Sequence, residues 1–576
     1  MLRAILRSVF GVAAGVRAAA APPPMEQGNA AWARGDLAEA GVWFTRAVEQ
    51  EADAQSVSSL GMVKFEAGRH DEGYALIHRA ASQWPEDAGA QCNLGLALAH
   101  GGDTSAARKY FLLALALDPG FEAAAINLAT AMQHACDWDG VEAYTAALVR
   151  DAQTGDLSAW AGRVSPFGAA LLPLAPALRR QVADYHAARL LARMQPLRLA
   201  PRSSGQQRIR LGYLSYDFYA HATTHLMAGL LARHDRQRFE VMAFSYGPDD
   251  GSEWRERIRA GCDEFVEVGS ESWAAVAQRI AAARIDILID LKGQTGGARP
   301  GIVACRPAPL IVNYLGCPGT AGSGLADYFV SDRQASPAHT DAEFSEALLR
   351  MPACYQVNDP LHALPAAPAR EAEGLPASGA VFACFNQSFK IERSTFGAWM
   401  RILGRVPDAV LWLMYGSAEA EQRLRAEAAA RGCDPARLVF ARRQPRMEHL
   451  ARHALADLFL DTHTCGAHTT GSDALRGGLP MLVFPAEGFA GRVSASLLHA
   501  AGLPEMVVRS WQEYEDMAVN LALDRTRLRA LHARLRDNLP AAPLFSAERY
   551  CADFESGLVA MWERHSAGLP PAAISL

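Results

Sequence analysis

The feature that most constrains this chain is a pattern that recurs every 33 or 34 residues near its start. The recurring positions are Gly28, Gly61 and Gly95; Gly35, Gly68 and Gly102; Phe44, Ile77 and Phe111; Ala47, Ala80 and Ala114; and Pro85 and Pro119. Small residues at a fixed period allow two helices to cross closely, and a proline after the second helix ends it. The pattern therefore predicts stacked pairs of helices.

This period and these residue types are typical of tetratricopeptide repeats. Three units share the register, and a weaker fourth begins at Leu128 and fades at "HACDW", so we expect about three repeats within residues 25–150. An ordinary helical bundle is not expected to keep four kinds of position in phase. Repeat superhelices of this type form concave surfaces that hold extended peptides or partner proteins.

Composition limits the kind of protein and its partners. A chain of 576 residues is too long for one hydrophobic core, so three or more domains are expected. The net charge of −6 and the pI near 6.3 provide no strong basic field, which argues against nucleic acid or an anionic membrane as the main partner. Ten cysteines without a C-x-x-C pair argue against a disulfide framework or a zinc site, and favour a reducing, cytoplasmic location.

The first 24 residues form an apolar, arginine-containing extension that ends in three prolines. They are compatible with a signal peptide, although Arg7 and Arg17 interrupt the apolar stretch. A disordered extension, or a true start at Met25, explains them equally well. No run of about 18 uninterrupted apolar residues occurs, so no membrane span is expected.

After the repeats, an Ala/Leu/Arg-rich stretch over residues 151–207 is expected to be a helical linker region, and the pattern then changes. Short apolar runs such as "IRLGYLS", "FEVMAFSY" and "IDILIDL" alternate with helical stretches. Such runs predict parallel sheets covered on both faces by helices. They form two sets, which predict one Rossmann-like lobe over 208–365, a linker over 366–378, a second lobe over 379–565 and a tail over 566–576.

Polar and glycine-containing segments follow several of these predicted strands. "GYLSYDFYAHATTHL" places Asp217 and His221 after the first strand, and "YLGCPGTAGSG" follows a later strand of the same lobe. Ligands of doubly wound sheets bind beyond the carboxyl ends of the strands. We therefore expect a ligand cleft between the two lobes, with Asp217 and His221 facing it from the first lobe.

The segment "DTHTCGAHTTGSDAL" is the most informative of these strand ends. His468, Thr469 and Thr470 stand where a helix is expected to begin, and the free N–H groups and dipole of a helix start favour a phosphate. Asp473 is placed to accept hydrogen bonds from ribose hydroxyls. Simple N-capping by threonine is the competing explanation, but the accompanying His and Asp favour a nucleotide.

Lys390 is the second informative residue. Lysine occurs only at positions 64, 109, 292 and 390 in this arginine-rich chain, and Lys390 follows a predicted strand in "FNQSFKIERST" together with Gln387. A compact ammonium at that place can neutralise a leaving diphosphate. We interpret the other lysines as structural.

Several motifs with known chemistry are missing from the predicted α/β region. No D-x-D pair, which commonly holds a divalent metal on a sugar nucleotide, follows a predicted strand, so no metal site is expected. No P-loop and no G-x-G-x-x-G unit occurs, which argues against a kinase or a dehydrogenase. His449, His453 and His463 lie among arginines, which favours stacking or packing over metal binding.

Together these segments resemble the O-GlcNAc transferase family of protein glycosyltransferases, glycosyltransferase family 41. The resemblance covers about residues 26–563 and rests on "GYLSYDFYAHATTHL", "RPAPLIVNYLGCPGTAG", "FNQSFKIERST", "CGAHTTGSDAL" and "SWQEYEDMAVNLALD". It implies a GT-B fold that follows a tetratricopeptide superhelix. It also implies inverting transfer of GlcNAc from UDP-GlcNAc to Ser or Thr hydroxyls of proteins, with no metal and no other cofactor.

The resemblance also implies roles for individual residues. His221 and Asp217 match the two candidates for the general base, between which the family's assignment is open, and Lys390 matches the lysine on the diphosphate. The donor-binding positions that it implies are Thr223, Leu315, Gly316, Pro318 and Cys465 at the sugar; His468, Thr469 and Thr470 at the diphosphate; and Gln387, Arg446, His449 and Asp473 at the nucleoside.

Departures from the animal enzyme concern the acceptor more than the donor. The repeats are far fewer, the linker near residues 364–378 has no room for an inserted domain, and Phe389 stands where the animal enzyme has tyrosine. Two alternatives stay open: a SPINDLY-like transferase of fucose from GDP-fucose, and a repeat adaptor whose transferase half is vestigial. A homo-oligomer is also compatible with the sequence.

Overall fold

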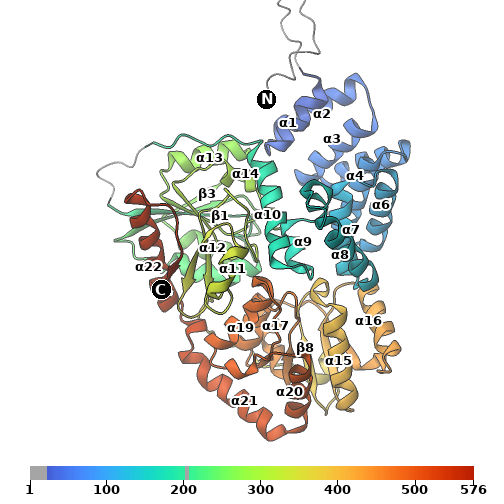
Figure 1. Cartoon of the computed structure of the whole chain (residues 1–576), viewed down its shortest axis with the longest axis vertical. Coiled ribbons are helices and arrows are strands. Elements are labelled where there is room, and N and C mark those ends of the chain that lie inside the picture. The colour runs from blue at the N-terminus through green and yellow to red at the C-terminus, as the bar shows by residue number, and fades with distance from the viewer. Residues whose placement is uncertain (1–21, 201–206) are drawn as a thin grey trace, which may run out of the picture.

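The computed structural model describes residues 22–200 and 207–576, so the expected extension over residues 1–24 lies almost entirely outside the described residues. Figure 1 shows three parts: a helical arm that starts near the N-terminus, and two α/β lobes stacked below and beside it. This arrangement confirms the predicted fold class, a tetratricopeptide superhelix followed by two Rossmann-like lobes.

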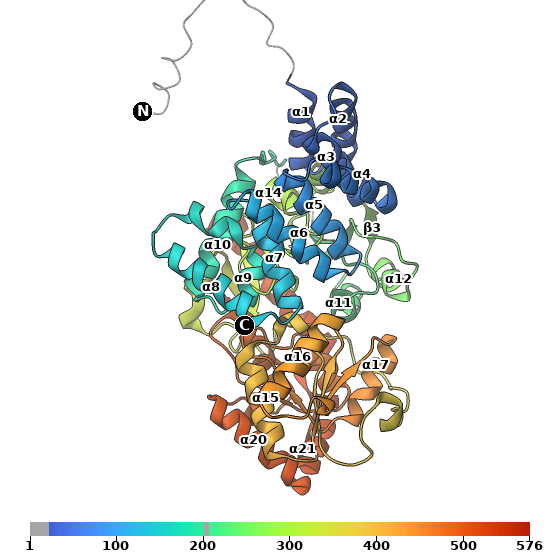
Figure 2. The same cartoon turned by 90° about the vertical axis from the view of Figure 1, so that its right-hand side faces the viewer.

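The arm consists of eight helices in four antiparallel pairs. They are α1 (Pro24–Ala33), α2 (Leu37–Gln50), α3 (Ala54–Glu66), α4 (His70–Gln83), α5 (Ala88–His100), α6 (Thr104–Leu117), α7 (Glu122–His134) and α8 (Trp138–Ala152). Figure 2 shows the repeats descending from α1 toward the second lobe, which is drawn in orange. The pairs stack in sequence order, as expected of a solenoid.

The repeat glycines lie where the two helices of a pair cross. A Cβ atom on Gly28 would lie 2.5 Å from the ring of Phe44, and one on Gly95 would lie 2.6 Å from the ring of Phe111. The second glycine of each unit ends the turn between the helices in the left-handed region, with φ of 72°, 82° and 88° at Gly35, Gly68 and Gly102. Close crossing and a left-handed turn are thus the physical reasons for the repeat pattern.

The fourth helix pair is more complete than the sequence pattern indicates. Cys136 stands 34 residues after Gly102 and has the same left-handed backbone, with φ of 53°. Its Sγ atom lies 3.6 Å from the carbonyl oxygen of Ser388 in the second lobe. The expected count of about three repeats is therefore too low, because a fourth pair forms. Its turn carries a cysteine in place of the glycine, and this cysteine contacts the second lobe.

A short helical segment connects the repeats to the first lobe. It contains α9 (Pro166–Leu171) and α10 (Pro176–Leu191). Ala170 of α9 packs against Cys465 and Ala490 of the second lobe, while α10 packs with Ala187 against the core of the first lobe. The linker region thus contacts both lobes.

The first lobe is built on an eight-stranded sheet, all parallel, in the order β13-β7-β6-β5-β4-β1-β2-β3. Its strands are β1 (Ile209–Ser215), β2 (Phe239–Ser245), β3 (Glu264–Glu267), β4 (Ile287–Asp290), β5 (Leu310–Asn313), β6 (Tyr328–Asp332), β7 (Ala347–Met351) and β13 (Ile574–Ser575). Its helices are α11 (Ala222–Leu231), α12 (Glu253–Ala260), α13 (Trp273–Ala282) and α14 (Pro300–Ala304). The sequence runs do not predict β3, β7 or β13, which lie at the two edges.

The second lobe contains a five-stranded parallel sheet in the order β10-β9-β8-β11-β12. Its strands are β8 (Val381–Cys384), β9 (Val410–Met414), β10 (Leu438–Ala441), β11 (Leu458–Leu460) and β12 (Met481–Leu482). Its helices are α15 (Arg393–Arg405), α16 (Ala418–Ala430), α17 (Arg446–Arg452), α18 (Thr469–Arg476), α19 (Phe489–Ala500), α20 (Trp511–Leu523) and α21 (Arg525–Asn538). All five strands were expected from their apolar runs.

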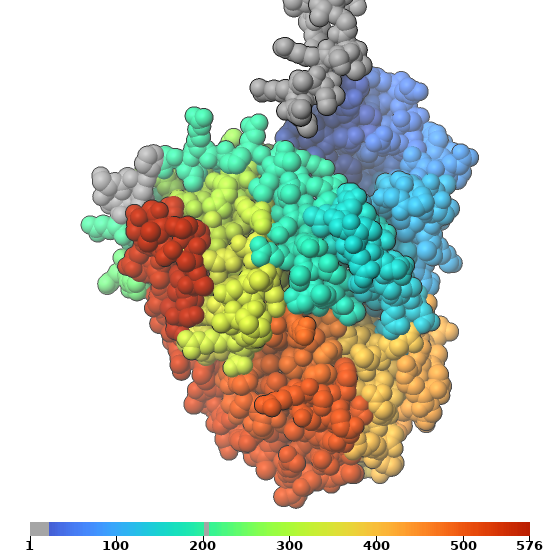
Figure 3. Space-filling model, viewed as in Figure 1, coloured from blue at the N-terminus to red at the C-terminus, as the bar shows by residue number. Residues whose placement is uncertain are grey.

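The end of the chain returns to the first lobe, contrary to the expected lobe limit at residue 565 and the expected tail over residues 566–576. Helix α22 (Ala547–Ser566) lies along the first lobe in Figure 3, where it is drawn in red. Glu555 of α22 accepts a 3.0 Å hydrogen bond from the ring of His234, whose other nitrogen lies 2.7 Å from the Tyr213 hydroxyl. Strand β13 then adds Ile574 to the sheet edge beside Leu349.

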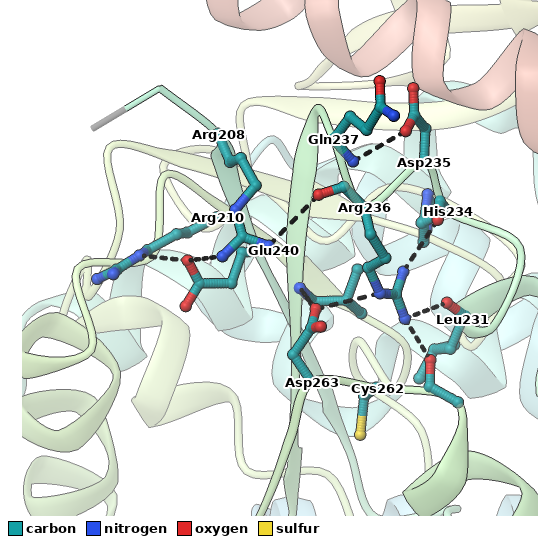
Figure 4. Close-up of polar contacts among 12 residues, drawn as sticks. Arg208, Arg210, Leu231, His234, Asp235, Arg236, Gln237, Glu240, Cys262 and Asp263 are labelled. Atoms are coloured by element: carbon teal, nitrogen blue, oxygen red, sulfur yellow. Dashed lines mark hydrogen bonds and ion pairs between the residues drawn. The ribbon is translucent and has the colours of Figure 1, made fainter. Parts of the chain in front are cut away.

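Arg236 fixes the turn that precedes β2, at the end of the first sheet remote from the cleft. Its guanidinium donates to the backbone carbonyls of Leu231, His234 and Gly261 and pairs with Asp263 at 3.2 Å (Figure 4). Carbonyl groups at a helix end and in a turn are thereby satisfied by a side chain.

The repeats contact both lobes. The indole N–H of Trp138 on α8 donates to the carbonyl of Ile391 in the second lobe, at 2.8 Å. At the other end of the arm, Gly35 packs against the indole ring of Trp273 in the first lobe, and Gly301 of that lobe packs against the same ring. A Cβ atom would lie 2.2 Å from the ring at Gly35 and 1.9 Å from it at Gly301. The arm therefore spans from the first lobe to the second.

Candidate active site

The first part of the site follows β1. The backbone N–H of Asp217 donates to Ser215 Oγ at 2.9 Å, and the Asp217 carbonyl accepts from the hydroxyl of Thr224. These bonds turn the chain so that the Asp217 side chain points back over the strand ends and is only 2% exposed. Helix α11 then begins, with His221 as its N-cap.

Lys292 joins this group from the end of β4. Its Nζ atom donates to both carboxylate oxygens of Asp217, at 2.8 and 3.0 Å. The side chains are 8% and 2% exposed, so this is a buried ion pair. The interpretation of Lys292 as merely structural is therefore insufficient, since it contacts a candidate for the general base. The signal was its rarity and its place after a strand, the same signal that identified Lys390.

His221 lies at the rim of this group, with its side chain 35% exposed. Its Nδ1 atom accepts the backbone N–H of Thr223 at 3.2 Å and lies 3.5 Å from Asp217 Oδ2. Burial lowers the pKa of His221; the Asp217 carboxylate acts in the opposite direction and Lys292 in the same one. A neutral ring whose Nδ1 accepts an N–H carries its proton on Nε2, so the ring offers a donor to the cleft.

Thr223 is buried beside the same carboxylate, with its Oγ1 atom 3.5 Å from Asp217 Oδ2. The candidate sugar residues lie in the loop after β5, which is two strands away from β1 in the sheet. Leu315 adopts a left-handed φ of 70°. A Cβ on Gly316 would lie 2.3 Å from the Leu291 carbonyl oxygen and 2.7 Å from Lys292 Cα, so only glycine allows this approach. Pro318 borders a small cavity of about 40 Å³ between α10 and the two lobes.

In the second lobe, Lys390 follows β8 and donates from Nζ to the carbonyl of Gly466 at 2.8 Å. This bond ties the loop after β8 to the loop that leads into α18. The fourth repeat also contacts this loop. Ser388 Oγ donates to the His134 carbonyl at 2.8 Å, and the rings of His134 and Phe389 lie 4.9 Å apart. Lys390 thus sits at a junction of three segments.

The start of α18 is held by a buried amide. Asn386 donates to Asp461 Oδ1 and Thr462 Oγ1 at 2.9 and 2.8 Å, and its own oxygen accepts from Thr470 Oγ1 at 2.6 Å. The sequence analysis did not single out Asn386. The first backbone bonds of α18 are made by Gly471 and Ser472 to the His468 carbonyl. The amides of Thr469 and Thr470 precede them and form the helix start that suits a phosphate.

His468 lies at this helix start beside Lys390. Its Nε2 atom lies 3.0 Å from the Ala490 carbonyl, which therefore accepts the ring N–H. Burial, reinforced by the Lys390 charge, lowers the pKa of His468 to about 3. The ring is neutral at physiological pH and leaves Nδ1 as an acceptor.

The nucleoside residues come from α17 and α18. Arg446 makes a two-pronged ion pair with the buried Asp473, at 2.8 and 3.2 Å, so the expected ribose-binding carboxylate is engaged by an arginine. His449 packs edge to face against His453 and lies 5.4 Å from the ring of Phe385. Burial, with the nearby His453 and arginine charges, lowers the pKa of His449 to about 2.

Two predicted residues lie at the margins of the site. Gln387 is partly buried and directly precedes the 3₁₀ turn that carries Lys390. Cys465 is buried against Ala170 of α9, and burial raises the pKa of its thiol. Cys465 packs against the connecting segment and also interacts with Lys390, which donates to the carbonyl of its neighbour Gly466.

The two halves of the site face each other. Arg446 on α17 lies near enough to His225 on α11 for its charge to help lower the pKa of His225. Gln356, which follows β7 of the first lobe, donates to Ser472 on α18 at 2.6 Å, and Arg476 on α18 donates to the carbonyl of Pro360 at 2.7 Å. The structure therefore places α11, which His221 caps, beside α18, which begins at Thr469.

A separate cavity of about 590 Å³ lies on the repeat side of the Lys390 loop. Trp138 and Glu142 of α8, Leu171 and Arg179 of the connecting segment, and Trp511 of α20 line it. It contains Lys390 but none of the nucleoside residues. This cavity therefore does not include the predicted nucleoside positions.

Two carboxylate groups bear on metal binding. The chain does contain one D-x-D, at Asp137 and Asp139, but it starts α8, where Asp137 caps the helix and Asp139 pairs with Arg393. Among the described residues, the ligand atoms of His234, Cys551 and Glu555 lie within 4.8 Å of one another. His234 follows α11, and Cys551 and Glu555 lie on α22; all three are buried, none of them is a predicted site residue, and His234 and Glu555 already bond each other.

Two Rossmann-like lobes in one chain, with a helix that begins at Thr469 after a strand of the second lobe, have the architecture of the GT-B fold class of glycosyltransferases. The chain belongs to glycosyl transferase family 41, whose family model matches residues 135–367 and 364–554. It is similar to a solved O-GlcNAc transferase structure from Thermobaculum terrenum, with a TM-score of 0.70 and 26% identity over 95% of this chain and 98% of that one.

Curated relatives point to the same family. The chain is 38% identical over 425 residues to a probable UDP-N-acetylglucosamine–peptide N-acetylglucosaminyltransferase, SEC, of Arabidopsis thaliana, covering 71% of this chain and 44% of that one. A Caenorhabditis elegans UDP-N-acetylglucosamine–peptide N-acetylglucosaminyltransferase is 30% identical over 76% of this chain and 48% of its own length. SPINDLY of Petunia hybrida is 28% identical over 64% and 40%. The chain spans less than half the length of these relatives.

None of the helices within residues 22–200 and 207–576 is both long and apolar enough to span a membrane.

Proposed function

We propose that this protein transfers N-acetylglucosamine from UDP-GlcNAc to Ser or Thr hydroxyls of proteins, with inversion and without a metal. The observation that carries the proposal is the Lys390–Gly466 bond, which holds an ammonium beside the helix start of Thr469 and Thr470. A positive charge and free amides at one point match a diphosphate leaving group. The names of the family relatives support the same donor and a peptide acceptor.

In the proposed reaction, the acceptor hydroxyl attacks the anomeric carbon from the face opposite UDP. The bond from that carbon to the diphosphate oxygen breaks as the new C–O bond forms. Lys390 and the α18 amides stabilise the charge that develops on UDP. The hydroxyl proton leaves to Asp217, to His221 or through a water relay. Thr223 and the loop from Leu315 to Pro318 hold the sugar.

The protein acceptor is proposed to enter along the repeats, whose last pair contacts the Lys390 loop through Ser388 and Ile391. A cytoplasmic, reducing location is proposed from the ten cysteines. All ten lie in the described residues, unpaired, and nine of them are buried.

Calorimetric titration with UDP, without added metal, tests the donor site. We expect UDP to bind, and Lys390→Ala to weaken it about tenfold or more, because a charge-assisted bond is lost. Lys109→Ala, at an exposed lysine of α6, is the matched control. Transfer of labelled GlcNAc to a peptide array then tests the reaction. Binding without transfer to any acceptor would favour a vestigial transferase on a repeat adaptor.

GDP-fucose is the second candidate donor, because the sequence also resembles SPINDLY-type fucose transferases; the names of the SPINDLY relatives themselves give UDP-N-acetylglucosamine. The same titration with GDP separates the two candidates. Tighter binding of GDP than of UDP would contradict the proposed donor and favour fucose transfer.

A further inference from the structure

Lys292 and Asp217 form a buried ion pair at the floor of the cleft. Both carboxylate oxygens accept from the ammonium, at 2.8 and 3.0 Å, and both residues are nearly inaccessible to solvent. Lysine is rarely buried unless it is paired. Asp290, the other carboxylate at the end of β4, accepts the backbone N–H groups of Lys292 and Gly293 instead. Asp217 is therefore the carboxylate that receives the Lys292 side chain.

The charged and titratable groups around Asp217 come from several elements. Lys292 and Asp290 come from the β4 end, His221 and Tyr219 from the segment before α11, and Tyr246 from the β2 end. The ring of Tyr216 lies 5.5 Å from Lys292 Nζ. Of these groups, Lys292 contacts both carboxylate oxygens of Asp217, and His221 Nδ1 lies 3.5 Å from Oδ2.

This geometry separates the two candidates for the general base. Each Asp217 oxygen already accepts a hydrogen bond from the Lys292 ammonium, and Oδ2 also lies 3.5 Å from the Thr223 hydroxyl and from His221 Nδ1, so protein groups already occupy positions around the carboxylate oxygens. His221, at 3.5 Å, lies on the open side toward the cleft. A fixed negative charge beside an imidazole favours its protonated form.

We propose that Lys292 is a positioning residue: its ammonium holds the Asp217 carboxylate beside His221, so that Asp217 acts on the reaction through the charge of His221 and is not the proton acceptor. This inference rests on the proposed glycosyl transfer. Lys292 and Asp217 together then set the protonation of the histidine that faces the substrates.

Three variants test the pair: Lys292→Met, Asp217→Asn, and both together. The first readout is the pKa of the His221 ring, followed by NMR of histidine-labelled protein and assigned by its loss in His221→Gln. Lys292→Met removes a positive charge and is expected to raise this pKa. Asp217→Asn removes a negative charge and is expected to lower it. A nearby unit charge shifts a pKa by about one unit or more.

The second readout is the pH profile of kcat/KM for transfer. If transfer needs neutral His221, its acid limb moves to higher pH in Lys292→Met and to lower pH in Asp217→Asn, by the same shifts as the ring. UDP affinity is expected to stay within about threefold. A His221 pKa unchanged in Lys292→Met would overturn the proposal. So would faster transfer in Lys292→Met together with complete loss in Asp217→Asn, since that is the behaviour of a carboxylate base released from its partner.

Folding and the proposed function are controlled separately. The double variant replaces the pair with two neutral side chains of similar size, so it removes the unpaired buried charge that threatens the single variants. Its His221 pKa is expected between those of the single variants, and a value outside that interval contradicts the proposal. The NMR titration needs no transfer, so it decides the role of Lys292 even if the protein proves inactive on every acceptor.

Discussion

The indole N–H of Trp138 donates to the backbone carbonyl of Ile391, one residue after Lys390. The last repeat therefore holds the backbone of the loop that carries Lys390. The Arg393 guanidinium reinforces the contact by pairing with Glu142 of α8 at 2.8 Å. The segment that the proposed function assigns to donor binding is thus also a contact of the repeat arm.

Trp138→Phe tests this contact. An aromatic ring is retained, although a smaller one, while the hydrogen bond is lost, which leaves the Ile391 carbonyl without its buried donor and costs about 1–3 kcal/mol. We expect a lower unfolding midpoint and UDP affinity reduced about threefold to tenfold. Trp43→Phe, whose indole N–H bonds only Glu39 within α2, is the control. Unchanged UDP affinity in Trp138→Phe would separate the repeats from the donor site.

Gly316→Ala tests the sugar loop. The new methyl group would meet the Leu291 carbonyl oxygen and Lys292 Cα, both backbone atoms that cannot turn away. We expect a loss of about 1–3 kcal/mol in unfolding free energy and a large loss of transfer with UDP affinity retained. Gly319→Ala, three residues later and with no neighbour within 4 Å of its Cβ position, is expected to behave like the parent protein. Equal effects at both positions would contradict the crowding argument.

His449→Phe and His449→Ala separate stacking from hydrogen bonding at the nucleoside. Stacking of a base on a ring contributes about 1–3 kcal/mol, so Ala is expected to weaken UDP binding about tenfold or more and Phe clearly less. Because burial lowers the pKa of His449 to about 2, its ring stays neutral, and UDP affinity is not expected to change through His449 between pH 5 and 8. Equal affinity of the Phe and Ala variants would argue against stacking.

Buried histidines make the fold sensitive to acid. The pKa values of His225, His449, His453 and His468 are lowered to about 3, 2, 4 and 3, chiefly by burial. Below pH 6.5 the unfolded chain takes up protons at these residues and the folded chain does not, so the unfolding free energy falls as the pH falls. Each contributes up to about 1.4 kcal/mol per pH unit in that window.

Chemical denaturation between pH 7.5 and 5 measures this effect. The midpoint is expected to be level above pH 7 and to fall below pH 6.5. His468→Gln is expected to flatten the slope relative to the parent protein, while His565→Gln, at an exposed histidine of α22, is expected to leave it unchanged. A midpoint that rises on acidification would contradict the assignment of these rings as neutral and buried.

Sequence patterns predict those parts of this molecule that local rules determine. The repeat glycines were recognisable because a helix crossing and a left-handed turn demand glycine at fixed spacing. The fourth repeat does not match the sequence pattern, because Cys136 replaces the turn glycine. Cys136 instead contacts Ser388, which is 252 residues away. Edge strands such as Glu264–Glu267 and Ile574–Ser575 lack the long apolar runs that mark central strands, and β13 is fixed only by its pairing with β7.

The candidate site shows the same division. Strand-end position and residue type were sufficient to single out Asp217, His221, Lys390 and Asp473. They did not disclose that Lys292 binds Asp217 or that Arg446 binds Asp473, since each pair joins separate segments through side-chain geometry. Partners of buried charges are decided by tertiary packing, which a single sequence does not contain.

The contacts of the arm at Trp273 and at Trp138 have a mechanical consequence. Because the arm contacts the first lobe at one end and the second lobe at the other, any change in its curvature acts on these contacts. Bending of the repeats would therefore strain one of these two contacts or shift one lobe relative to the other.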